Sequence, residues 1–467
     1  MSSMLPYELK GLPHDDCVSL FRKWAFNDGD DGQYPNLMRI GEDIVKKCKG
    51  IPLAVRTLGS LLFAKTDESE WMTIRDSEIW RLEQSENDIL PVLKLSYNYL
   101  PPYLQRCLAC LSLYKKDYLH PSDDVILFWM ANGLLEHPKQ NEEWEDVGKR
   151  YLKELWSRCF IQDVEIRSFY FVFKVHDLIH DLLLDVSQKE CKILYSQTEG
   201  IDEKVRHISF CDDHQQLVKF PQALKNRKYI RTVFLQQSSC IIDLSFVKFC
   251  VSNFKYLRAL DLSGSPLKAL PDSVGTLKHL RYVGLRGCRH LRKIPGSFYK
   301  LQSLVMLKMM GVRVPSVQLH KMQSFVRLRY LEISVKALPS EGIQPRCWPS
   351  LQYLAFFVCD FEWLFEEIQY LTSLRTLNLF VCPKLVSLPR SLKFLTKLEH
   401  LQIQRCGAIN LHMELEEEED HHLQLSLKTF TVIQADALTD LPRLLLEGSS
   451  STLQWITLSR CSRSNDL

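Results

Sequence analysis

The 467 residues are enough for two or three domains, and 46% hydrophobic with 25% charged residues are ordinary globular values. A formal net charge of +3 argues against a dedicated nucleic-acid or membrane-surface binder. No apolar run approaches the roughly 18 residues of a membrane helix, and the start MSSMLPYELK lacks the features of a signal peptide. We therefore expect a cytoplasmic protein without an integral membrane segment, which could associate with a membrane through its partners.

The first hundred residues have helical periodicity and predict a helical subdomain over 1–100. Gly50 suits the end of the second predicted helix, and Pro52 suits the first turn of the third because the N–H there has no helical partner. The predicted helices lie in HDDCVSLFRKWAFND, NLMRIGEDIVKKCKG, GIPLAVRTLGSLLFA, EWMTIRDSEIWRL and NDILPVLKLSYNYL.

Residues 101–192 predict a winged-helix domain. The segments LQRCLACLSLY, DDVILFWMANGLL and DVGKRYLKELWSRCFIQDV supply three helices, and Asp123 and Asp124 suit the positive start of the second. The aromatic, strand-like SFYFVFKVHD follows a turn at Arg167 and indicates a β-hairpin. The region is not strongly basic, so we expect no nucleic-acid partner.

The stretch FKVHDLIHDLLLD at 173–185 holds two His-Asp pairs four residues apart, which would place His176 and His180 on one helix face. A zinc site would need a third ligand and an ordered second shell, and a His-Asp phosphohydrolase would need further ligands. Neither set is evident, so we predict no metal site here. We interpret His180 and Asp181 as helix-surface or capping residues, and expect Asp177 to help cap the following helix.

After about residue 228 the pattern L-x-x-L-x-L recurs with conservative apolar swaps. Successive starts are spaced by 27, 23, 24, 24, 23, 23, 24, 29 and 26 residues, at or near the leucine-rich repeat period of roughly 20–29. One repeat cannot bury its apolar side alone, but a stack can. We therefore predict an α/β solenoid over 205–467, and an α+β multidomain protein as a whole. The ten units begin at Ile230, Leu257, Leu280, Leu304, Leu328, Leu351, Leu374, Leu398, Leu427 and Leu453.

The 15 cysteines are predicted to be packed free thiols rather than disulfides or metal ligands. Cys107 and Cys110 form a C-x-x-C without the second pair that a four-thiolate zinc site requires. Five repeats place a cysteine three residues after the sixth position, where the leucine-rich consensus has Asn or Cys. These are Cys288, Cys359, Cys382, Cys406 and Cys461.

Strand alternation should send the third and fifth positions of each unit to the concave face of the solenoid. The third-position column is rich in Tyr, Trp and Met, which anchor protein interfaces, although such mixed surfaces also occur on any solenoid. The acidic run at 416–420 is predicted to be a solvated insertion. The candidate partner-binding residues are Tyr282, Tyr330, Tyr353, His400 and Trp455.

Together these segments resemble the plant intracellular immune receptors of the nucleotide-binding leucine-rich repeat (NB-ARC/LRR) class, in the coiled-coil subclass. LKGLPHDDCVSLFRKWAF is similar to the motif that follows their nucleotide-binding core, and GIPLAVRTLG to their GLPL motif, with Ile51 in place of Leu. CLACLSLYKKDYLHPSDDVILFWMANGLL is similar to their winged-helix signature, and VHDLIHDL to their MHD motif, with Val175 in the Met position. The resemblance runs from about residue 7 to the C-terminus.

This resemblance implies ADP/ATP as the cofactor of the full-length family. His176 occupies the place of the histidine that contacts the β-phosphate of ADP, and Pro52, with Leu53, that of the residues near the adenine. The nucleotide would then hold two subdomains in a closed, inactive state, and exchange for ATP would release them.

The phosphate loop and the acidic magnesium-binding strand of the family are not found in this sequence. The nearest match, GSLLFAKT at 59–66, has Ala64 where the second Gly belongs and continues a helix, so it cannot wrap N–H groups around an anion. We therefore expect no enzyme activity, interpret the chain as N-terminally truncated, and expect it to supply only one side of a nucleotide site.

The predicted function is recognition by an immune receptor fragment. The solenoid would bind a pathogen effector or a guarded host protein and regulate an ADP/ATP-dependent defence switch, with other parts of the receptor or other receptor chains as further partners. One alternative is a leucine-rich repeat adaptor without nucleotide dependence. Another is a switch ATPase whose phosphate loop is encoded upstream of Met1.

Overall fold

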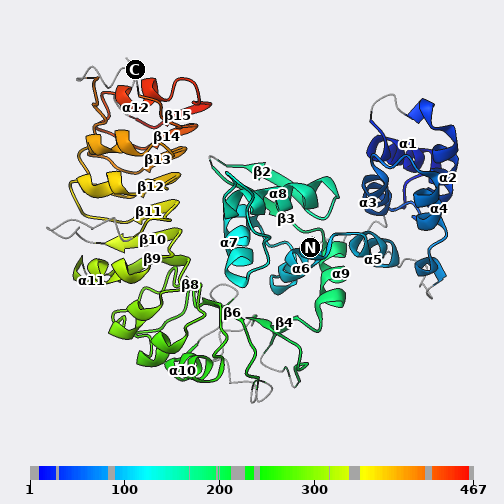
Figure 1. Ribbon diagram of the computed structural model, residues 1–467, viewed down its shortest axis with the longest axis horizontal. Helices are drawn as coiled ribbons and strands as arrows, with labels where there is room; N and C mark the ends of the chain where they lie inside the picture. The colour runs from blue at the N-terminus through cyan, green and yellow to red at the C-terminus, as the bar shows by residue number, and fades with distance from the viewer. Residues whose placement is uncertain are drawn as a thin grey trace, which may run out of the picture. The chain divides into compact units, whose positions relative to one another are not determined.

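The computed structural model describes residues 10–27, 31–81, 90–167, 169–195, 198, 200–211, 224, 227–235, 242–314, 316–335, 348–415 and 423–461. Two compact units make up the chain (Figure 1). The first comprises Met1–Met130, Leu134–Glu165 and Phe171–Gln188, and the second comprises Ala131–Gly133, Ile166–Tyr170 and Lys189–Leu467. None of the helices in the described ranges has the length and apolar character needed to cross a bilayer.

The start of the first unit is helical, as predicted. Pro35 and Pro52 each occupy a first helical turn, and Asp67 accepts a hydrogen bond from the Ser69 N–H to cap α4. A Cβ at Gly59 would lie 2.8 Å from the Trp24 Cβ, so glycine permits α3 to pack closely on α1. The helices are α1 (His14–Ala25), α2 (Pro35–Lys47), α3 (Pro52–Leu62), α4 (Glu68–Arg75) and α5 (Leu90–Asn98).

The predicted helices and β-hairpin of the winged-helix domain are present, with a further short strand. The three strands form a sheet in the order β1-β3-β2. Trp129 in α7 donates a hydrogen bond from its indole N–H to the Cys107 carbonyl at 2.9 Å and so ties α7 to α6. The elements are α6 (Pro102–Ala109), β1 (His120–Pro121), α7 (Ser122–Asn132), α8 (Trp144–Ser157), β2 (Gln162–Ile166), β3 (Phe171–Lys174) and α9 (Asp177–Ser187).

The second unit contains a parallel sheet whose strands stack in sequence order from β4 to β15. All ten predicted units form a strand, and each strand begins at the third position of its unit. The strands are β6 (Thr232–Leu235), β7 (Ala259–Asp261), β8 (Tyr282–Gly284), β9 (Met306–Val314), β10 (Tyr330–Val335), β11 (Tyr353–Phe357), β12 (Thr376–Phe380), β13 (His400–Gln404), β14 (Thr429–Ile433) and β15 (Trp455–Ser459).

The prediction of ten units missed two strands at the start of this sheet, β4 (Cys191–Leu194) and β5 (His207–Phe210). The segment VRHISF at 205–210 fits the L-x-x-L-x-L pattern with apolar swaps, whereas β4 does not carry the pattern. They pair in parallel with each other, and β5 pairs with β6. The predicted end of the winged-helix domain, residue 192, lies inside β4. The three-part division at 100 and 192 otherwise stays a prediction.

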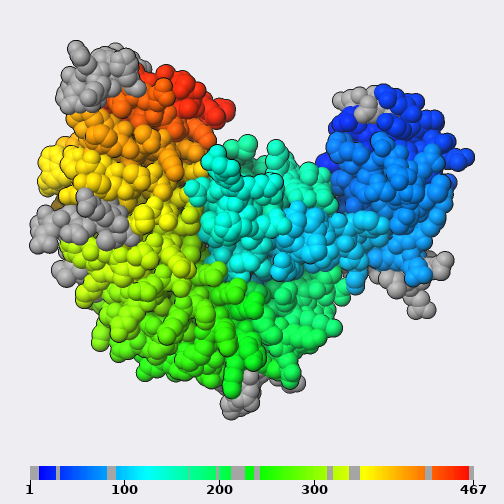
Figure 2. Space-filling model, viewed as in Figure 1, coloured from blue at the N-terminus to red at the C-terminus, as the bar shows by residue number. Residues whose placement is uncertain are grey.

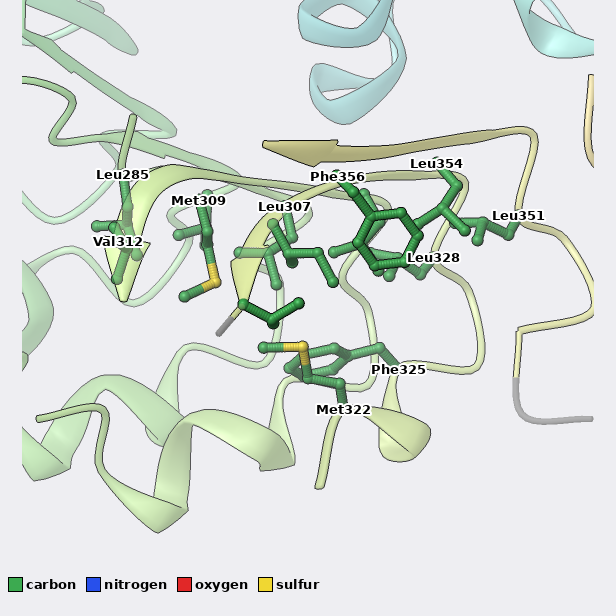
Figure 3. Close-up of a cluster of buried hydrophobic side chains, with 14 of the residues drawn as sticks. Leu285, Leu307, Met309, Val312, Met322, Phe325, Leu328, Leu351, Leu354 and Phe356 are labelled. Carbon is green, nitrogen blue, oxygen red and sulfur yellow. The ribbon is translucent and has the colours of Figure 1, made fainter. Parts of the chain in front are cut away.

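The solenoid core consists of the fourth- and sixth-position side chains of successive strands. Leu331, Ile333, Leu354 and Phe356 have no exposed surface, and Figure 3 shows Leu307, Leu354 and Phe356 gathered with side chains such as Phe325 from the return segments. The sheet lines the inner side of the arc, and α10 (Leu244–Asn253), α11 (Ser316–Lys321) and α12 (Arg443–Gly448) lie on its outer side (Figure 1).

The cysteines in the described ranges are free and buried, which confirms the prediction of packed thiols. Burial raises the pKa of the Cys107 thiol, so it stays protonated. In the five repeats that carry a cysteine, the residue before it has a positive φ, and this residue turns the chain out of the strand. The residues are Gly287, Val358, Val381, Arg405 and Arg460.

Candidate functional site

The inner face of the solenoid sheet brings the five predicted partner-binding residues into one column. Each of them begins a strand, and the strand register places Tyr330 beside Tyr353, and Thr429 beside Trp455. Side chains two and four residues further along each strand lie on the same face. We call this surface the concave face; it has two halves of different chemistry.

The N-terminal half of the concave face is charged. The Tyr282 hydroxyl donates to an Asp261 carboxylate oxygen at 2.8 Å. The Lys308 ammonium lies 5.6 Å from the ring centroids of both Tyr282 and Tyr330, in the range of a cation–π interaction with each. The two tyrosines are buried, and their rings hold a cation within the face.

Beside them, Tyr330 and Tyr353 stack with their ring centroids 4.0 Å apart and their planes 3° from parallel. The Arg286 guanidinium donates to Glu332 at 2.6 Å, and the Tyr330 hydroxyl also donates to Glu332. The Asn378 amide donates to the Tyr353 hydroxyl at 2.9 Å. The predicted tyrosines are therefore members of an ordered hydrogen-bond network.

The C-terminal half of the concave face is more apolar. Phe357 and Phe380, the last residues of β11 and β12, stack at 4.8 Å and 2°. Trp455, which begins β15, is 70% exposed. His400 lies 2.8 Å from the Thr429 hydroxyl through Nδ1. This half offers large apolar surface, which is the usual content of a protein contact.

Our sequence analysis named only third-position residues and so missed Lys308, Glu332, Phe357 and Phe380. These lie at the fifth and seventh positions, which follow from strand alternation once each strand start is known. The acidic run at 416–420 lies outside the described residues.

The second candidate site lies at the start of α9. His176 is its N-cap, with φ −60° and ψ 143°, and its Nδ1 accepts a hydrogen bond from the Leu178 N–H at 3.1 Å. The expectation that Asp177 caps this helix is therefore wrong, since Asp177 is already the first helical residue. Because Nδ1 is an acceptor, a neutral His176 ring carries its proton on Nε2, which can donate to an anion.

The prediction that His180 is a surface or capping residue is wrong. His180 is buried, and its Nε2 lies 2.7 Å from the Tyr114 carbonyl oxygen. The helix turns this ring toward the core, where the polar group needs a partner. Asp181 is partly exposed and pairs with Lys116 at 2.7 Å.

Pro52 and Leu53 begin α3, with Pro52 exposed and Leu53 buried. In the described part of the chain, neither is linked to His176 by a hydrogen bond or ion pair, so their joint role at a nucleotide stays a prediction. The segment 59–62 of GSLLFAKT is helical, as expected. Within the same ranges, no group of three or more His, Cys, Asp or Glu side chains is arranged to hold a metal ion.

Two family models match this chain. The disease resistance protein winged helix domain matches residues 113–183, and a leucine-rich repeat region matches residues 204–344. The putative disease resistance protein RGA1 of Solanum bulbocastanum is 38% identical over 293 residues, which cover 62% of this chain and 27% of that protein. The chain is a relative of the plant disease resistance proteins. This relationship confirms the resemblance and the predicted winged-helix and leucine-rich repeat folds.

A second relative of this kind, the putative disease resistance RPP13-like protein 1 of Arabidopsis thaliana, is 32% identical over 323 residues, 65% of this chain and 29% of that protein. The chain spans 25–29% of the length of the first four curated relatives it matches. Among solved structures, a leucine-rich repeat protein of Leptospira interrogans has a TM-score of 0.39 at 18% identity, covering 52% of this chain and 65% of that one.

Proposed function

We propose that this chain is the sensing part of a plant immune receptor, and that its solenoid recognises a pathogen effector or a guarded host protein. The observation that carries this proposal is the match of residues 113–183 to the winged-helix domain of disease resistance proteins, followed in the same chain by the leucine-rich repeats. Solenoids of this kind present an extended curved surface suited to a protein partner.

The concave face supports recognition through its two halves. The charged half is held by internal hydrogen bonds, which lowers the entropy cost of binding. The apolar half contains the exposed Trp455 at the start of β15 and the stacked Phe357 and Phe380 at the ends of β11 and β12. We propose that the apolar half supplies most of the binding free energy.

A plant line that lacks the gene encoding this chain tests the recognition function. We expect such plants to become susceptible to at least one isolate of a pathogen panel, and the wild-type gene to restore resistance. A Phe357→Glu/Phe380→Glu gene should fail to restore it. Phe394→Glu, at a 51% exposed aromatic residue outside the sheet, is the matched control and should restore it. Unchanged susceptibility of the gene-deleted line to every isolate would contradict the proposal.

We further propose that His176 belongs to an ADP/ATP-dependent switch. Its capping hydrogen bond leaves Nε2–H as a donor, which fits a phosphate oxygen. A phosphate oxygen of ADP would accept the hydrogen bond from Nε2 of His176. This bond would hold the start of α9 close to the nucleotide. The resemblance of VHDLIHDL to the MHD motif supports this role.

Titration of the purified chain with fluorescently labelled ADP tests the switch. We expect saturable binding that His176→Ala abolishes and that Asp181→Ala, at a partly exposed position five residues further along the chain, leaves unchanged. If the wild-type chain does not bind ADP at all, the adaptor alternative without nucleotide dependence is favoured instead.

A further inference from the structure

Three successive repeats carry nearly the same tetrapeptide just before their strands: KYIR at 228–231, KYLR at 255–258 and KHLR at 278–281. Neither the concave face nor the nucleotide candidate uses these residues. We call the set the basic edge. It consists of Lys228, Tyr229, Arg231, Lys255, Tyr256, Arg258, Lys278, His279 and Arg281.

Backbone hydrogen bonds fix the register of the basic edge. The Arg258 N–H donates to the Arg231 carbonyl at 2.7 Å, and the Arg281 N–H donates to the Arg258 carbonyl at 2.8 Å. Equivalent residues therefore lie on neighbouring turns of the solenoid, about 4.8 Å apart. The repeats that carry the edge form the first, green part of the solenoid in Figure 2.

The aromatic residues of the basic edge stack on one another. The Tyr229 and Tyr256 ring centroids are 5.7 Å apart at 22°, and those of Tyr256 and His279 are 6.0 Å apart at 17°. The Arg206 guanidinium lies 5.3 Å from the Tyr229 centroid. Both faces of each tyrosine ring are thus occupied by neighbours, while Tyr229 and Tyr256 remain 59% and 49% exposed. The two tyrosine rings therefore offer no free face on which nucleic-acid bases could stack.

The cations of the basic edge have no acidic partner among the residues that the structure describes. In the described part of the chain, none of its lysines or arginines forms an ion pair with a carboxylate. Lys255 donates to the Val251 carbonyl and Arg258 to the Asn132 carbonyl. Burial and repulsion from Arg231 and Arg281 lower the pKa of Arg258. An anion placed on the edge would relieve this repulsion.

We propose that the basic edge docks an acidic α-helix of a partner protein. Carboxylates at i, i+4 and i+7 of a helix recur about every 5.4 Å along its axis, close to the ring spacing of 5.7 and 6.0 Å along the edge. Carboxylates on one side of an extended strand recur about every 6.8 Å, which departs further from this ring spacing. This docking surface is separate from the concave face and does not depend on the nucleotide switch.

The test uses the full chain and two synthetic alanine-based helical peptides of about 20 residues. One aligns four glutamates on a single helix face, and the other distributes the same glutamates around the helix. We expect fluorescence anisotropy to show about 10-fold tighter binding of the aligned peptide, weakening as salt increases. Equal binding of both peptides, or no binding of the aligned one, overturns the proposal.

The variant Lys228→Glu/Lys255→Glu/Lys278→Glu should weaken binding of the aligned peptide by about 100-fold. The charge-matched control Lys300→Glu/Lys384→Glu/Lys397→Glu, at exposed lysines elsewhere on the solenoid, should leave it unchanged. Because charge reversal can disturb folding, Lys228→Gln/Lys255→Gln/Lys278→Gln is measured too, with an intermediate loss expected. Equal losses in edge and control variants overturn the proposal. The proposal is also overturned if phosphatidylserine vesicles or single-stranded DNA bind more tightly than the aligned peptide and the edge variant weakens that binding.

Discussion

The solenoid and the winged-helix domain make their contacts in different ways. In the solenoid, the neighbours of Leu354 are Leu331 and Leu377, which hold the same position in the adjacent repeats. In the winged-helix domain, the partner of His180 is Tyr114, 66 residues earlier in the chain. In a repeat array, the sequence therefore predicts which side chains meet, because equivalent positions of adjacent repeats are neighbours. In a domain without repeats, the contacts follow only from the three-dimensional structure.

The largest effect is expected in the solenoid core. Leu377→Ala removes a fully buried side chain from β12 and should lower the free energy of unfolding by about 3 kcal/mol. Urea denaturation measures the loss, with Val386→Ala at a 38% exposed site as the control. In the Leu377→Ala variant, amide hydrogen exchange should accelerate more in β11 and β13, the neighbours of β12, than in the distant β5. Uniform acceleration across the sheet would contradict the nearest-neighbour description.

Acid should destabilise both regions through buried histidines. Burial lowers the pKa of His120 and of His207 to about 3. Since the unfolded side chains titrate near pH 6.5, the unfolded state binds more protons below that pH. Each histidine should therefore lower the free energy of unfolding by about 1.4 kcal/mol per pH unit as pH falls from about 6 to about 4.

His120→Phe separates the two contributions. This variant should lose the contribution of His120 to the pH dependence of the free energy of unfolding and keep the contribution of His207. This expectation holds whatever the variant does to stability at pH 7. Denaturant titrations at pH 7, 6, 5 and 4 provide the measurement. A slope identical to that of the wild type would show that His120 is not buried in its neutral form.

An intermediate effect is expected from His180→Leu, which leaves the buried Tyr114 carbonyl without its 2.7 Å partner. We expect a loss of about 2 kcal/mol in the free energy of unfolding. Asp181→Ala, which removes the partly exposed pair with Lys116, should cost less than about 1 kcal/mol. Similar losses in the two variants would be evidence against a buried, hydrogen-bonded His180.

The smallest effect is a gain in stability at Val381, a β-branched residue with φ 56°. Glycine adopts this conformation without the side-chain clash, so Val381→Gly should raise the free energy of unfolding by about 0.5 kcal/mol. Val386→Gly, where φ is not positive, should lower it by a similar amount. A loss at both sites would indicate that Val381 stabilises the solenoid through its side chain more than its backbone costs.

The candidate sites were predictable to different degrees. Each strand start in the solenoid followed from the leucine spacing, so the concave column was predicted in register. The network of Lys308, Glu332 and Arg286 was not, because which charged groups meet depends on how far each side chain extends across neighbouring strands. At α9, the sequence suggested the importance of His176, but the capping bond that orients its ring depends on the backbone conformation before the helix.

The sequence by itself determined the repeat period, the ten strand starts, the buried thiols and the helical start of the chain, because these depend on local periodicity and on residues that meet their own equivalents. Only the tertiary structure decided that β4 extends the sheet and that His180 lies inside the core. These features arise where residues distant in sequence pack together, and no local pattern encodes which surfaces will meet.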